Sequence, residues 1–252
     1  MSANDRDLTG SHAHGQNGAS LNLVRTKSRR IAGSLCCALT IGAATVILSH
    51  AQTRAAKPAP GWTASDWIAW LEQPDRVSHL NIEIIVASLG LKPGDIVADI
   101  GAGAGAFEPA LVAAVSPGGK VYANEIDPAL LEHIAMRMRE KNVGTVVTVL
   151  GKPADPNLPS RDVDVAFLHV VLHHVADRAA FIKSTAGYLK PSGRFAVIDL
   201  PRVSSDQDQQ ERFVSKDQVN RWMGAAGLKP LQELDFLMPG KWFMVYGKSD
   251  AG

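Results

Sequence analysis

The chain of 252 residues carries a formal net charge of +1, and 46% of its residues are hydrophobic. This length suits one large α/β domain with an additional segment. The balanced charge gives no support for a nucleic-acid surface, since no basic run with interleaved aromatic residues is present. Both cysteines, Cys36 and Cys37, lie in an apolar N-terminal stretch. The rest of the chain therefore has no thiol for a disulfide, a Cys-ligated metal or nucleophilic catalysis.

The first 51 residues have the order of regions found in a secretory signal peptide. A basic cluster ending at Arg29 and Arg30 precedes an apolar run at residues 31–48, and small residues follow at the positions that a signal peptidase reads. This predicts export to the periplasm or the exterior, with cleavage after Ala51. Because the run is close to spanning length, an uncleaved anchor with membrane contact through residues 31–48 is one alternative. A cytoplasmic extension is another.

A linker and a helical cap are predicted next. Residues 52–60 are rich in Ala, Pro and Lys, which predicts an extended linker. The segment 61–90 predicts a helical cap, whose first helix places three large apolar side chains of residues 67–71 on one face. That face favours packing on the domain over a substrate lid. Pro74 ends this helix, and a second helix is predicted over residues 76–89.

Residues 91–248 are predicted to form one α/β domain, which opens on a buried strand at 96–100. The strand leads into Asp-x-Gly-x-Gly-x-Gly, which begins at Asp99 and is followed by a helix at 106–115. The motif glycines are Gly101, Gly103 and Gly105. Glycines allow a sharp backbone bend against a ligand, and an acid at the strand end accepts hydrogen bonds from a cationic or hydroxylated ligand. A small-molecule site is therefore predicted here.

The glycine spacing bears on the kind of ligand. A dinucleotide site carries Gly-x-Gly-x-x-Gly with a pyrophosphate at the helix N-terminus. Here an acid stands two residues before the first glycine, which is unhelpful to a pyrophosphate and suits a ligand with an ammonium group. An NAD-dependent oxidoreductase is therefore the less favoured alternative.

Further strands are predicted at 120–125, 145–150, 163–169 and 194–200, with helices between them. The first of these places Glu125 at its carboxyl end, where an acid can bind the two hydroxyls of a ribose. The chain closes with a helix at 215–227 and two strand-like runs around Pro239-Gly240, which fit a terminal antiparallel hairpin.

Three stretches resemble one family. VADIGAGAG at 97–105, LHHV at 172–175 and LKPSG at 189–193 are similar to motifs of the small-molecule branch of class I S-adenosylmethionine-dependent methyltransferases. The resemblance covers roughly residues 75–247. It implies a Rossmann-like class I methyltransferase fold of the α/β class. In that fold a mostly parallel seven-stranded sheet has helices on both faces and ends in a C-terminal antiparallel hairpin.

The resemblance also implies S-adenosyl-L-methionine as the cofactor, and roles for individual residues. Asp99 and Gly101 would hold its amino-acid end, Glu125 its ribose and Asp155 its adenine. Lys152 stands where Gly-Asp is common in the family, so backbone groups are an alternative adenine contact. The remaining predicted cofactor contacts are Ala102, Gly103, Ile126, Ala154 and, through its backbone, His169.

The histidines near the fourth strand invite two further interpretations. His169 and His173 are four apart, which on a helix would suit a metal, but His169 is predicted at a strand end, so no metal site is predicted. His173 or His174 is a candidate general base. A packing or hydrogen-bonding role for both is the alternative.

The predicted activity is methyl transfer to a small-molecule acceptor by in-line displacement, in which the protein's main task is placement. A cofactor-binding protein without catalysis is the alternative. The predicted export signal conflicts with a cofactor that is made and used in the cytoplasm. The accepting atom is not predicted.

Overall fold

The computed structural model describes residues 61–200, 213–236 and 240–248. The predicted signal peptide or anchor at residues 1–51 and the linker at 52–60 lie outside these ranges and stay predictions. None of the helices in the described ranges combines the length and apolar character needed to cross a bilayer.

Three short helices precede the sheet: α1 (Ala64–Leu71), α2 (Pro74–Ser78) and α3 (Ile82–Ser88). The parallel strands are β1 (Ile96–Ile100), β2 (Lys120–Glu125), β3 (Val146–Leu150), β4 (Val163–His169) and β5 (Leu189–Asp199). The segments between them form α4 (Glu108–Val115), α5 (Pro128–Glu140), the 3₁₀ turn η1 (Leu172–His174) and α6 (Arg178–Ala186). The chain continues with α8 (Lys216–Ala225), β6 (Leu228–Leu234) and β7 (Trp242–Lys248).

The seven strands form one sheet in the order β3-β2-β1-β4-β5-β7-β6. The first five are parallel, whereas β7 runs antiparallel to both β5 and β6. Because Asp199 at the end of β5 pairs with Trp242 at the start of β7, the start of β7 lies at the edge where the parallel strands end. The predicted fold, including the antiparallel strand beside the fifth, is confirmed.

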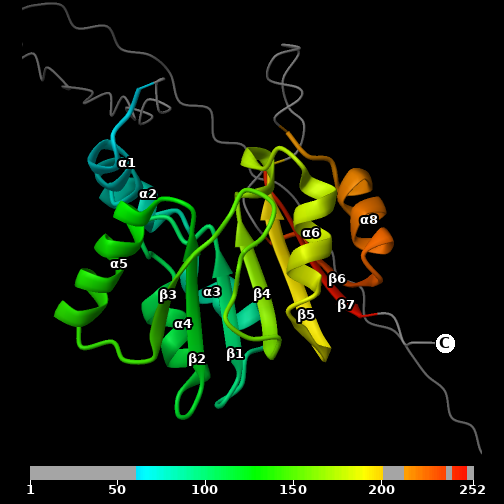
Figure 1. Ribbon diagram of the computed structural model, residues 1–252, viewed down its shortest axis with the longest axis horizontal. Helices are drawn as coiled ribbons and strands as arrows, with labels where there is room; N and C mark the ends of the chain where they lie inside the picture. Colours follow the sequence, from blue (N-terminus) through cyan, green and yellow to red (C-terminus); the bar gives the residue numbers. More distant parts are fainter. Residues whose placement is uncertain (1–60, 201–212, 237–239, 249–252) are drawn as a thin grey trace, which may run out of the picture. The chain divides into compact units, whose positions relative to one another are not determined.

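Helices pack on both faces of the sheet (Figure 1). One apolar cluster joins alternate strand residues to α6 and α8 through Ile182 and Met223, and these two helices lie side by side. A second cluster joins the opposite strand residues to α3 and α4 through Ile85 and Leu111. Alternation of side chains along each strand thus divides the core into two layers.

Two predicted boundaries were wrong. The single helix expected at 76–89 is broken into α2 and α3, because Asn81 takes a left-handed conformation with φ of 55°. Asparagine tolerates this conformation better than most residues, and its place between the helices was overlooked. The fifth strand, expected at 194–200, begins earlier, because Leu189 already pairs with Val163; the register then shifts, and regular pairing with β4 resumes at Arg194.

The cap helix α3 provides a matched test of this packing. Ile85 is fully buried, whereas its neighbour Ile84 is 55% exposed. We expect Ile85→Ala to lower the free energy of unfolding by about 2–5 kcal/mol, because it leaves a cavity between α3 and the sheet. Ile84→Ala should change it by less than about 0.5 kcal/mol. Urea unfolding of both variants measures the difference, and equal effects would contradict the packing of α3.

Candidate active site

The glycine turn after β1 is fixed by the neighbouring strand β2. The N–H groups of Gly101 and Ala102 both donate to the Asn124 carbonyl, at 2.8 and 2.9 Å. Gly101 has a φ of 75°, and a Cβ added there would lie 2.6 Å from a methyl group of Val171. Only glycine fits at this position, because both the conformation and the space exclude a side chain.

Glu125, at the carboxyl end of β2, is tied to the same turn. Its Oε2 accepts a hydrogen bond from the Gly103 N–H at 3.1 Å, and its Oε1 accepts one from the Ile126 N–H at 2.7 Å. Burial raises the pKa of Glu125, while these backbone N–H groups oppose the rise. The structure thus brings together Gly101, Gly103 and Glu125 as the sequence predicts.

Two carboxyl groups are buried beside the turn. Asp99 is 2% exposed and Glu108 is fully buried. Asp99 Oδ2 and both carboxyl oxygens of Glu108 meet no donor of normal hydrogen-bond geometry in the described part of the chain, although the two carboxyls can share a proton when one of them is protonated. Burial raises the pKa of Asp99 well above its usual range, and the nearby carboxyls of Glu108 and Glu125 raise it further. Burial likewise raises the pKa of Glu108 to about 7, although the Arg137 guanidinium opposes this rise.

Buried acids without partners are costly unless a ligand satisfies them. A cationic donor placed beside Asp99 and Glu108 would supply the missing hydrogen bonds and favour the ionised carboxylates. The turn is therefore suited to a ligand that carries an ammonium group.

A histidine–aspartate pair lies at the same edge of the sheet. His173 in η1 and Asp199 at the end of β5 are joined by a hydrogen bond of 2.9 Å between Nδ1 and Oδ1. Asp199 is fully buried and also accepts the Leu200 N–H at 2.8 Å. This arrangement fixes the orientation of the imidazole ring. His174 is adjacent, with ring centres 3.9 Å apart.

His169 is placed at the end of β4, as the sequence predicts. Its ring centre lies 5.1 Å from that of Phe107, which directly precedes α4. Its Nε2 lies 3.3 Å from Lys241 Nζ. Burial lowers the pKa of His169 well below its usual range, and the positive charges of Lys241 and Arg76 lower it further, so the ring is neutral.

The predicted adenine residues lie in the loop after β3. The Asp155 carboxylate accepts hydrogen bonds from the Asn157 N–H at 2.8 Å and the Tyr188 hydroxyl at 3.0 Å. Ala154 is exposed, as is Ile126 at the end of β2. The adenine role of this loop and the cofactor contacts of these residues stay predictions.

Metal ligation has no support in the described ranges, where no group of three His, Cys, Asp or Glu side chains is placed to hold an ion. His169 lies on β4 and His173 in η1, so the two do not share a helix face. The four-residue spacing between them therefore does not create a ligand pair.

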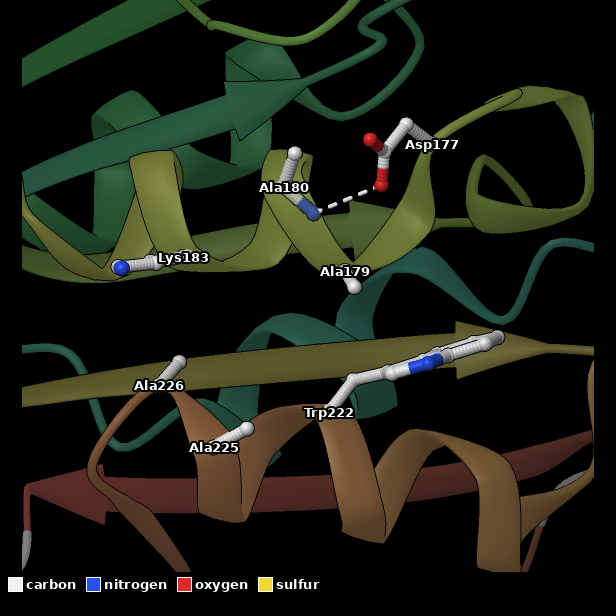
Figure 2. A pocket seen from close by; sticks show the side chains of 7 residues that line it. All are labelled: Asp177, Ala179, Ala180, Lys183, Trp222, Ala225 and Ala226. Carbon is white, nitrogen blue, oxygen red and sulfur yellow. Dashed lines mark hydrogen bonds between the residues drawn. The ribbon is translucent and has the colours of Figure 1, made fainter.

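A separate hollow of about 350 Å³ lies between α6 and α8. Figure 2 shows Trp222 from α8 facing α6 there, opposite Ala179. Its lining includes none of the turn, histidine or carboxylate residues described above.

Three functional candidates were not predicted from the sequence: Glu108, Asn124 and Asp199. Glu108 follows the glycine motif, but an acid at a helix start is usually a solvated or dipole-pairing group. Asn124 links the turn to the loop after β3, donating from Nδ2 to the Val149 and Pro156 carbonyls at 3.2 and 2.7 Å. Of the three, only Asp199 could have been predicted from the sequence, because it ends a strand at the ligand-binding edge of a parallel sheet.

The comparisons with known proteins agree with this geometry. Residues 98–197, which span the glycine turn, β2, β4, η1 and most of β5, match a family model described as a methyltransferase domain. Residues 98–197 thus form a methyltransferase domain, and the fold is that of the class I S-adenosylmethionine-dependent methyltransferase superfamily. S-adenosylmethionine, the cofactor predicted from the sequence, is the cofactor of this superfamily.

Several characterised methyltransferases are similar to the chain. Nocamycin O-methyltransferase of Saccharothrix syringae is 31% identical over 42% of this chain and 38% of its own length. The ubiquinone/menaquinone biosynthesis C-methyltransferase of Shewanella woodyi is 25% identical over 60% of this chain and 61% of its own length. A crystal structure of an S-adenosylmethionine-dependent methyltransferase from Aquifex aeolicus has a TM-score of 0.65 at 23% identity, covering 73% of this chain and 98% of that one. The chain thus spans less than two thirds of the length of the Saccharothrix and Shewanella enzymes.

The site described above fits S-adenosylmethionine on structural grounds. S-adenosylmethionine carries an ammonium group, which the unpartnered oxygens of Asp99 and Glu108 suit. It also carries a ribose, which suits a carboxylate held at a strand end as Glu125 is.

The buried acid pair predicts a pH-dependent stability. In the unfolded chain Glu108 titrates near its ordinary pKa of 4.5, whereas burial raises its folded pKa to about 7. Between these two pKa values the folded protein therefore binds more protons than the unfolded chain. The free energy of unfolding should fall as pH rises from about 4.5 to about 7, and Glu108 should contribute about 3 kcal/mol to this fall.

Urea unfolding at about pH 5 and about pH 8 measures the effect. We expect Glu108→Gln to flatten the pH dependence, since the amide does not ionise. Glu132→Gln, at an exposed position on α5, should leave it unchanged. Equal slopes for Glu108→Gln and the unmodified protein would contradict this account of Glu108.

Proposed function

We propose that the domain transfers a methyl group from S-adenosylmethionine to a small organic acceptor. The observation that carries this proposal is the His173–Asp199 hydrogen bond of 2.9 Å, at the same sheet edge as the acidic glycine turn. The relatives named above support it, since one is an O-methyltransferase and the other a C-methyltransferase.

The cofactor roles follow from the acidic side of the site. Asp99, assisted by Glu108, would accept hydrogen bonds from the ammonium group, and Glu125 would accept those of the ribose hydroxyls. The Gly101 backbone would border the amino-acid end. When bound, S-adenosylmethionine supplies a methyl group already activated for transfer by its sulfonium charge.

The protein's remaining tasks are placement of the acceptor and removal of its proton. With Nδ1–H donating to Asp199, Nε2 of His173 is the ring nitrogen that can accept a proton. Asp199 positions the ring and stabilises its protonated form. His174 remains the second candidate for this role, and a purely structural role for both histidines is the alternative.

Substitution of Glu125 tests the cofactor role. Glu125→Ala should weaken S-adenosylmethionine binding more than tenfold, because it removes the ribose acceptor and frees the Gly103 N–H that Glu125 holds. Calorimetric titration measures the affinity, with Glu132→Ala as the matched control on an exposed helix face. Unchanged binding would remove Glu125 from the site.

Substitution of the histidines tests the base. His173→Gln should lower kcat by about 10²–10⁴-fold at an unchanged affinity for S-adenosylmethionine, because glutamine cannot take up a proton. Asp199→Asn should lower kcat as well, since the amide no longer stabilises the protonated ring. His174→Gln distinguishes the two candidates, and full activity in both histidine variants would end the base hypothesis.

Turnover tests the function itself. The full chain is incubated with S-adenosylmethionine carrying a labelled methyl group and a panel of phenols, quinols and hydroxy acids, and labelled products are detected by mass spectrometry. The proposal predicts a methylated product together with S-adenosylhomocysteine. Tight cofactor binding with no product from any acceptor would favour the non-catalytic alternative.

A further inference from the structure

Two cations from distant parts of the chain, Arg76 and Lys241, act on His169, since both charges lower its pKa. Arg76 comes from α2, and its guanidinium carbon lies 3.8 Å from the ring centre of Trp70. Lys241 comes directly before β7, with its Nζ 3.3 Å from His169 Nε2. Within the described ranges, no carboxylate lies at ion-pair distance from either cation.

The electrostatics of this cluster favour an added negative charge. Burial lowers the pKa of Lys241, and the nearby Arg76 charge lowers it further, while only Asp199 opposes the shift. Burial also lowers the pKa of Arg76. Partly buried like charges repel each other and have lost hydration, so an anion between them would relieve both costs.

A third donor, Trp70, lies beside Arg76. The Nε1–H of Trp70 is buried and has no hydrogen-bond partner in the described part of the chain. Its ring lies under the Arg76 guanidinium, which leaves the edge of that group open to donate. A buried indole N–H normally finds an acceptor, so its lack of one also indicates a ligand with acceptor oxygens.

We propose that Arg76, Lys241 and Trp70 form a site for the carboxylate of an organic acid acceptor. The inference rests on the proposed methyl transfer for the role of this acid, whereas its binding needs only the cluster. The planar guanidinium group of Arg76 suits a carboxylate, because it can bind both carboxylate oxygens through two parallel hydrogen bonds.

Lys241 and His169 lie between the two other parts of the site. His169 contacts Lys241 on one side and Phe107, at the end of the glycine turn, on the other. Asp199 pairs in register with Trp242, the residue after Lys241, and holds His173. A carboxylate bound by the cations has its lone pairs occupied, so it anchors the acceptor while a separate hydroxyl or carbon is presented to His173.

Binding of benzoate and of uncharged benzamide to the full chain, by calorimetry with and without S-adenosylhomocysteine, tests the inference. These probes share a ring and differ in charge. We expect benzoate to bind at least tenfold more tightly than benzamide. Arg76→Gln and Lys241→Gln should each weaken benzoate binding about tenfold, with benzamide binding unchanged.

Arg161→Gln is the matched control, because Arg161 also lies over an aromatic ring, that of Tyr188, but before β4. It should leave benzoate binding unchanged. Thermal unfolding and S-adenosylmethionine affinity establish that the variants are folded. Equal affinity for the two probes, no benzoate binding at millimolar concentration, or insensitivity to both cation variants would overturn the inference.

The outcome is separable from that for methyl transfer. Selective benzoate binding without turnover on any acceptor would leave the anion site standing and refute the enzyme. Turnover that is equally fast on carboxylic acids and their amides would support the enzyme and refute the anion site.

Discussion

The hydrogen bond from the Gly103 N–H to Glu125 joins the two structural units on which the site depends. It links the glycine turn after β1 to the end of β2, and the Asn124 carbonyl reinforces the link through Gly101 and Ala102. The glycines of this turn have positive φ angles, and at Gly101 an added Cβ would also lie only 2.6 Å from Val171, so the backbone conformation favours glycine throughout. The same bend buries Asp99 and Glu108, an arrangement that suits a cationic ligand.

The charges are divided between two sides of the sheet edge. Acidic groups gather around the glycine turn, whereas Lys241 lies at His169, at the end of β4, where the charge of Arg76 also acts. Class I methyltransferases bind a cationic cofactor, so the acidic side matches its amino-acid end. In our proposal the basic side matches an anionic acceptor. The two ligands would then attract each other across the His173–Asp199 pair, which favours placement for the reaction.

The sequence predicted the parts that depend on local pattern. Alternating apolar strands, the Asp-x-Gly-x-Gly-x-Gly turn and the terminal hairpin led to the correct fold, because period and glycine spacing are local properties. Glu125 and His169 were placed at strand ends for the same reason. The break at Asn81 was missed, since a single left-handed residue inside an apolar helical pattern leaves little trace.

The missed site residues depend on contacts far apart in the chain. Asp199 meets His173 across 26 residues, and Lys241 meets His169 across 72. Nothing in the sequence near Arg76 indicates that its charge acts on Lys241. For Asp155 the sequence predicted the correct loop but not the direction of the side chain. Its carboxylate points to the Tyr188 hydroxyl, because that loop packs against the chain before β5.

The central claim is that buried carboxyls at the glycine turn hold the ammonium group of S-adenosylmethionine. Calorimetric titration of the full chain with S-adenosylmethionine, in two buffers of different ionisation enthalpy near neutral pH, tests it most directly, with NAD as the comparison ligand. Because burial raises the pKa of Asp99 and Glu108, the account predicts that S-adenosylmethionine binds with release of protons and that NAD does not bind. Absence of S-adenosylmethionine binding, or binding with no proton release, would contradict it.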